Sequence, residues 1–177
     1  MISLEHVRAL LADPPPPAPG KVCAFCDFAA GGDENVLALA EGNRVYIAAA
    51  WRSRDTSHSI GKFIALFKRL GLAGYDIAGD EGGMGHVILD RLQEQNFFLK
   101  RVNNGAAAKR PDIFCNLAAE QWSQVGQLIE RKAIVLPAGD EKLVAQLTSR
   151  QKQYHFTATS HHLRRRGSAK RRLSVTR

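Results

Sequence analysis

Several features that would place the chain in a common class are missing from its sequence. No run of about 18 apolar residues occurs, so we expect no membrane-spanning helix. The N-terminus lacks a basic segment followed by an apolar one, so we expect no secretory signal. There are only three cysteines, and no second pair of metal ligands stands at zinc-finger spacing from Cys23 and Cys26. These cysteines are therefore expected to pack as small apolar side chains in a protein of the reducing cytosol.

Acidic residues are absent from the C-terminal end, where basic residues gather. Seven of the 25 Lys and Arg residues lie in 163–177, so the rest of the chain has 18 basic against 17 acidic residues. A polybasic segment of this kind can bind the phosphate backbone of a nucleic acid by releasing counterions. A disordered, solvated terminus has the same composition. The sequence leaves both interpretations open.

Proline marks the first boundary along the chain. Apolar residues at helical spacing predict a helix over 2–12, and the proline-rich segment 13–20 ends it, because proline cannot continue a helix. Such a segment is typical of a semi-rigid spacer. We expect an N-terminal helix and linker over 1–20, a globular domain over 21–160 and a basic, disordered tail over 161–177.

The apolar pattern within 21–160 changes between period two and period 3.6. This alternation predicts an α/β domain with a mixed sheet. The expected strands are 21–27, 34–40, 44–50, 75–80, 97–102 and 135–136, and the expected helices are 57–71, 85–95, 113–131 and 139–149.

Two aspartates stand at the ends of predicted strands, each directly before a glycine-rich turn. Asp27 ends the first strand, and Asp80 ends the strand over 75–80. Carboxylates placed at the ends of neighbouring strands can meet across the sheet. Oxygen ligands of this kind suit Mg²⁺ or Mn²⁺, which take water and substrate phosphates for the rest of their coordination. The structural alternatives are a turn cap for Asp27 and a helix N-cap near Gly85 for Asp80.

Several segments occur in a characteristic order between Asp27 and Gln146. The first segment, 26–36, is an aspartate followed by a small-residue loop and a Gly-Gly-Asp turn. The others are 51–56, 75–85 with 89–92, 114–122 and 134–137. This ordered series resembles the nuclease domain of the phage terminase large subunit, an RNase H-like (ribonuclease H-type) fold. The resemblance implies a DNA endonuclease of viral packaging in the bacterial cytoplasm, with Asp27 bridging two ions of Mg²⁺ or Mn²⁺ and Asp80 holding one.

The sequence departs from that family in two ways. No Gly-x-x-x-x-Gly-Lys-Ser/Thr loop is present, so the chain by itself is not expected to drive ATP-powered translocation. The family also supplies a further acid after a segment similar to 160–167, whereas no acid follows Gly167 here. His161 is the metal-competent candidate near that position, with a loop histidine as its structural alternative. A nuclease impaired by the loss of its third acidic ligand would look like this.

Basic residues outside the candidate metal site suggest double-stranded DNA as a partner. Backbone contacts from such residues would position a duplex without reading its sequence; the candidates are Lys109, Arg110, Arg164, Arg165 and Arg166. The resemblance further implies a packaging ATPase, a small terminase subunit or a portal as protein partners. Two rival functions are a non-catalytic DNA-binding or packaging-accessory module with the same fold, and an actin-like ATPase.

Overall fold

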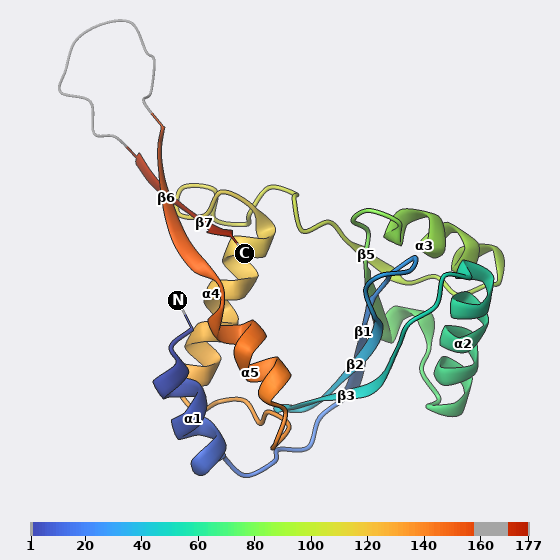
Figure 1. Cartoon of the computed structure of the whole chain (residues 1–177), viewed down its shortest axis with the longest axis horizontal. Coiled ribbons are helices and arrows are strands. Elements are labelled where there is room, and N and C mark those ends of the chain that lie inside the picture. The colour runs from blue at the N-terminus through green and yellow to red at the C-terminus, as the bar shows by residue number, and fades with distance from the viewer. Residues whose placement is uncertain (1, 158–169, 177) are drawn as a thin grey trace, which may run out of the picture. The chain divides into compact units, whose positions relative to one another are not determined.

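The computed structural model describes residues 2–157 and 170–176, and its contacts divide the chain into two compact units (Figure 1). The sheet unit comprises Pro14–Asn104 and Ile134–Ala138, and the helical unit comprises Met1–Asp13, Gly105–Ala133 and Gly139–Arg177. Residues 161 and 164–166, which include four of the predicted site residues, lie outside the described part of the chain. The expected domain limits at residues 20 and 160 stay a prediction.

The sheet unit is built on five strands in the order β3-β2-β1-β4-β5. Strands β1 to β3 pair antiparallel, whereas β4 is parallel to β1 and β5 is parallel to β4. The strands are β1 (Val22–Asp27), β2 (Asn35–Glu41), β3 (Arg44–Trp51), β4 (Ile77–Asp80) and β5 (Lys100–Val102). This arrangement confirms the α/β class and the mixed sheet.

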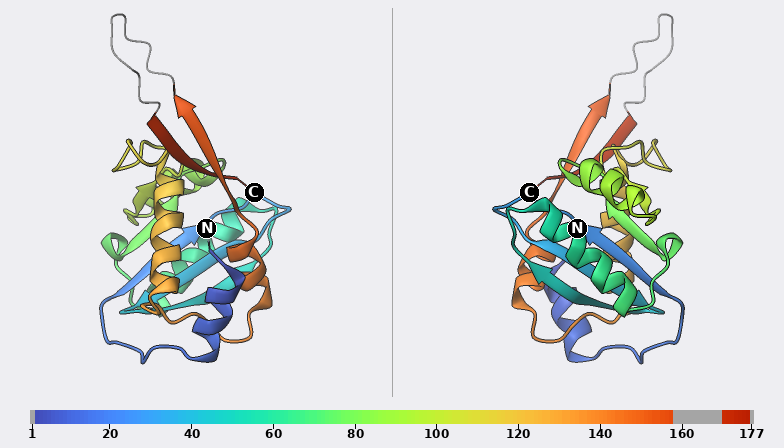
Figure 2. Two further views of the ribbon diagram at one scale, coloured as in Figure 1. Left: turned by 90° about the vertical axis from the view of Figure 1, so that its left-hand side faces the viewer. Right: turned by 90° about the vertical axis from the view of Figure 1, so that its right-hand side faces the viewer.

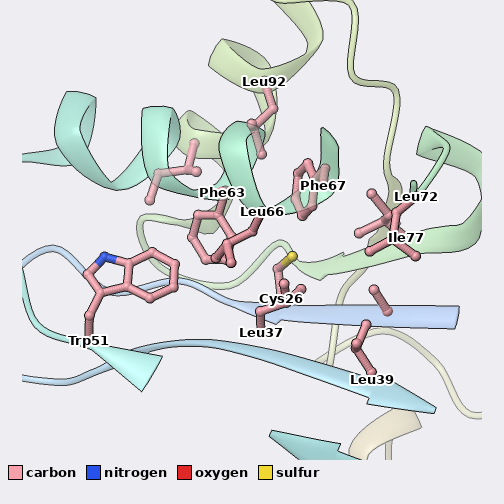
Figure 3. Close-up of a cluster of buried hydrophobic side chains, with 12 residues drawn as sticks. Cys26, Leu37, Leu39, Trp51, Phe63, Leu66, Phe67, Leu72, Ile77 and Leu92 are labelled. Atoms are coloured by element: carbon pink, nitrogen blue, oxygen red, sulfur yellow. The ribbon is translucent and has the colours of Figure 1, made fainter. Parts of the chain in front are cut away.

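Helices α2 (Thr56–Arg69) and α3 (Gly85–Glu94) cover one face of this sheet. Asp55 caps α2 as the sequence predicts, because its carboxylate accepts hydrogen bonds from the backbone N–H of Ser57 (2.8 Å) and His58 (3.1 Å). Phe63 and Phe67 of α2 are fully buried. They pack with alternate residues of the strands into the core that Figure 3 shows, which includes Cys26, Leu37, Leu39, Trp51, Leu66, Leu72, Ile77 and Leu92.

The helical unit contains α1 (Leu4–Ala12), α4 (Leu117–Glu130), α5 (Glu141–Thr148) and a hairpin of β6 (Gln151–Thr157) and β7 (Lys170–Thr176). Helix α1 packs on α4 and α5, which buries Val7 and Leu10. The hairpin strands lie side by side in both views of Figure 2. Strand β7 therefore occupies part of the segment 161–177 in which we expected a disordered tail.

Several element limits differ from the sequence prediction for local reasons. Helix α4 begins at Leu117 instead of 113, because Asn116 adopts extended backbone and caps the helix through the N–H of Ala119 (2.9 Å). The segment 74–76 forms a short 3₁₀ helix before β4. Val135 makes only an isolated bridge to β3 in place of the expected strand. None of the helices within the described residues is long and apolar enough to cross a membrane.

Candidate metal site

The register of the sheet brings the ends of β1 and β4 together. In this parallel pair Phe25 lies opposite Ala78 and Cys26 lies opposite Gly79. The next residue of each strand is the predicted aspartate, Asp27 or Asp80. Neighbouring strands are about 4.8 Å apart, so the two aspartates lie at adjacent positions at the same edge of the sheet.

The two aspartates also lie on the same face of the sheet. Successive side chains of a strand point to opposite faces. Cys26 and Ile77 are buried in the core beneath α2 and α3. Asp27 is one residue beyond Cys26, and Asp80 is three residues beyond Ile77, so both belong to the opposite face. The structure thus places the two residues at the same end of adjacent strands and on the same face, while their role as metal ligands stays a prediction.

The Asp80 carboxylate is held by two neutral donors. Its Oδ1 accepts a hydrogen bond from the backbone N–H of Gly82 (2.9 Å), and its Oδ2 accepts one from Nδ2 of Asn104 (3.0 Å). An ionised carboxylate can accept about four hydrogen bonds or metal contacts, so acceptor capacity remains. Within the described part of the chain, no Lys, Arg or His side chain forms an ion pair with Asp80. Within the described residues, the Asp80 carboxylate is therefore oriented by neutral donors alone.

The glycine-rich turn after β4 lets the backbone fold tightly around Asp80. A Cβ on Gly85 would lie 1.9 Å from the backbone oxygen of Asp80, which no side chain tolerates. Gly83 has a φ of 55°, a left-handed conformation that favours glycine. Glycine at these two positions therefore allows the backbone to turn closely around Asp80.

A buried polar network holds the loop after Asp27. Asn35 is fully buried; its Oδ1 accepts a hydrogen bond from the N–H of Ala29 (3.0 Å), and its Nδ2 donates to Oγ of Ser59 (3.3 Å). Nε1 of Trp51 donates to the same hydroxyl (3.4 Å). This network fixes the backbone two residues beyond Asp27. We did not predict this network from the sequence, although a polar residue at an alternate position of an apolar strand was the available signal.

The neighbouring acids do not join the aspartate pair. Glu81 and Asp90 both pair with Arg101, Glu81 at 3.5 Å. Among the residues that the structure describes, no group of three or more His, Cys, Asp or Glu side chains is placed to hold a metal ion. Within the described residues, the candidate site thus comprises two acidic side chains. Its oxygen donors suit Mg²⁺ or Mn²⁺, which keep several waters and bind substrate phosphates.

Cys26 contributes packing next to the site and no ligand. Burial, together with the nearby charge of Asp27, raises the pKa of its thiol, so the thiol stays protonated at neutral pH. A protonated thiol is a poor metal ligand. Cys23 lies on the other face of β1 and is exposed, unlike the packing that the sequence predicted for it.

The two predicted DNA contacts that the structure describes, Lys109 and Arg110, belong to a loop of the helical unit. Glu120 organises this loop, because its Oε2 accepts hydrogen bonds from the N–H of Lys109 (2.6 Å) and Arg110 (3.4 Å). Nε of Arg110 lies 3.5 Å from Oε1 of Glu120, and its guanidinium lies over the ring of Phe114. Both residues are exposed, but the Arg110 side chain is also engaged with Glu120 and Phe114.

The fold has known counterparts among solved structures. The nuclease domain of the large terminase subunit gp2 of bacterial virus Sf6 matches with a TM-score of 0.71 at 16% identity, over 99% of this chain and 87% of that chain. The large terminase nuclease from thermophilic phage G20c with bound magnesium matches with a TM-score of 0.62 at 17% identity, over 90% and 85%. No protein-family model matches, and no curated protein matches in sequence. The chain therefore has the RNase H-like fold of these terminase nuclease domains, which confirms the predicted fold class.

Proposed function

We propose that this chain is the metal-dependent DNA endonuclease domain of a phage terminase large subunit. The observation that carries the proposal is the placement of Asp27 and Asp80 at the same end and on the same face of an RNase H-like sheet. Solved neighbours support a divalent metal: the Sf6 domain was obtained with manganese, and the G20c nuclease with magnesium and with zinc. The proposed substrate is viral double-stranded DNA in the cytoplasm of the bacterial host.

The chain's own residues would carry the reaction in this way. Asp27 would bridge two cations and Asp80 would hold one of them, with His161 as the candidate for the remaining protein ligand. Bound divalent cations would supply an activated water and would stabilise the leaving oxygen of the cleaved phosphodiester. Gly82 and Asn104 orient the Asp80 carboxylate. With only two acids, we propose weak cleavage that prefers Mn²⁺.

Partners follow from the same proposal. Lys109 and the basic residues of 164–166 would contact DNA phosphates. A packaging ATPase, a small terminase subunit or a portal would bring the chain to its substrate, because the sequence contains no phosphate-cradling loop of its own.

Plasmid nicking tests the proposed activity directly. The purified chain should convert supercoiled to nicked plasmid in Mn²⁺ and not in EDTA. Asp27→Ala should reduce cleavage to the EDTA background, because the bridging carboxylate is lost. Asp33→Ala, which changes an exposed acid in the turn after β1, should cut like the wild type. Cleavage that persists in folded Asp27→Ala would show that the site is wrong.

A second candidate function is a non-catalytic DNA-binding or packaging-accessory module. The observation that favours it is the lack of a third His, Cys, Asp or Glu beside the aspartates within the described residues. A folded wild-type chain that binds duplex DNA and never cuts it, with either Mg²⁺ or Mn²⁺, would establish this alternative.

A further inference from the structure

Asn104 contacts Asp80 although the two residues are 24 positions apart in the sequence. Its Nδ2 donates to Oδ2 of Asp80 at 3.0 Å, while Gly82 N–H binds the other oxygen. The Gly82 contact is local and comes with the turn itself. The Asn104 contact depends on the tertiary fold, because it comes from the segment that follows β5.

The backbone that delivers Asn104 is firmly tied to the end of β4. Asp80 pairs with Val102 in the sheet, and the N–H of Glu81 donates to the carbonyl of Val102 (2.9 Å). Arg101 adds side-chain contacts, since its guanidinium binds both Glu81 on the turn and Asp90 on α3. Asn104 is two residues beyond this anchored pair. The pairing of β4 with β5 therefore fixes both the backbone of Asp80 and the backbone that leads to the Asn104 amide.

The chemistry of the donor decides what this contact can do. An arginine or lysine in the same place would neutralise Asp80 and compete with a cation. A neutral amide fixes the rotation of the carboxylate while leaving its charge and its other lone pairs available. Carboxylates that bind metals are commonly held by such hydrogen bonds, and the loss of one costs about 10–100-fold in metal affinity or activity.

We propose that Asn104 is a positioning residue that sets the Asp80 carboxylate for a divalent cation. The proposal deepens the proposed nuclease function and rests on it. It assigns to Asn104 no contact with DNA and no proton transfer. Its role is to remove the rotational freedom that Asp80 would otherwise lose when a cation binds.

Binding of Mn²⁺ alone, measured by calorimetry on the full chain without DNA, tests the proposal. We expect Asn104→Ala to weaken Mn²⁺ binding by about tenfold or more. Asn104→Gln keeps an amide donor one methylene farther out and should recover part of that loss. Thermal unfolding in EDTA is recorded for each variant, so that affinity is compared only between folded proteins.

Asn43 provides a matched control in the same unit. Its side chain accepts a hydrogen bond from the N–H of Ala18 (2.7 Å) and donates to the carbonyl of Pro16 (3.1 Å), so it is an asparagine with a purely structural role. Asn43→Ala should lower the unfolding temperature and leave Mn²⁺ affinity unchanged. A merely structural Asn104 would behave in the same way.

The outcomes separate the two proposals. If the wild type binds Mn²⁺ and Asn104→Ala binds it equally well, the positioning role is wrong and the nuclease proposal stands. If Asn104→Ala and Asn43→Ala lose affinity to the same extent, the effect is general and the positioning role is again wrong. If the wild type binds no more Mn²⁺ than Asp27→Ala, both proposals fall.

Discussion

Two carboxylates in this protein are held in opposite ways. Asp80, in the sheet unit, is partly exposed and accepts hydrogen bonds from two neutral donors, Gly82 N–H and the Asn104 amide. Glu120, in the helical unit, is 2% exposed, accepts two backbone hydrogen bonds and faces the guanidinium of Arg110. The charge of Glu120 is therefore satisfied within the protein, whereas among the described residues Asp80 is held by neutral donors alone.

The difference separates a structural acid from a candidate functional one. A buried charge must be paired and hydrogen-bonded, because its transfer from water is costly. Glu120 meets that requirement and in return organises the loop that contains Lys109 and Arg110. A metal-binding carboxylate instead needs a fixed orientation without a Lys or Arg side chain that neutralises its charge. Burial and partner type thus distinguish the two roles where residue type does not.

The largest effect that would sharpen this comparison is expected from Asp80→Asn. The amide keeps the shape of the side chain and one acceptor for Gly82, while Asn104 can rotate its amide to pair with it. Mn²⁺ affinity should fall by more than the roughly 10–100-fold that a lost supporting hydrogen bond costs. Calorimetry with Mn²⁺ and thermal unfolding in EDTA check this. A variant that unfolds earlier but still binds Mn²⁺ would make Asp80 a structural acid like Glu120.

The next largest effect is expected from Glu120→Ala, which should lower stability and leave Mn²⁺ affinity unchanged. Glu120→Ala leaves the N–H groups of Lys109 and Arg110 without their acceptor, so the free energy of unfolding should fall by about 2 kcal/mol. Mn²⁺ affinity should stay at the wild-type value. Urea unfolding and calorimetry measure the two quantities. Unchanged stability with weakened Mn²⁺ binding would break the comparison.

The smallest effects distinguish the two basic neighbours in the Glu120 loop. Arg110 is about half exposed, and two backbone N–H groups still donate to the buried Glu120 carboxylate without it, so Arg110→Ala should cost only about 1 kcal/mol of stability. Lys109→Ala should leave stability unchanged, weaken duplex binding and reduce the slope of log affinity against log salt by about one. Fluorescence titrations of duplex DNA at several salt concentrations measure that slope. Equal slopes for wild type and Lys109→Ala would remove Lys109 from the DNA interface.

The strands of the sheet, and the position of an aspartate at the end of two of them, could be predicted because the signals for a strand lie within a few neighbouring residues. The apolar run of β1 and the glycine-rich turns after Asp27 and Asp80 are visible in the sequence, and parallel strand ends meet at one edge of a sheet. The role of the two aspartates as metal ligands stays a prediction. Asn104 was not predictable, since its partner is 24 residues away and an asparagine after a strand is common. An apolar helix face likewise does not reveal which element it packs against. Only the structure therefore shows that residues 1–13 belong to the same compact unit as residues 105–133.

Crystals of the chain soaked in Mn²⁺ test the central claim most directly, because manganese is located by its anomalous scattering. The account predicts a peak within about 2–2.5 Å of carboxylate oxygens from both Asp27 and Asp80. Manganese bound elsewhere, or carboxylates turned apart with no peak between them, would contradict it.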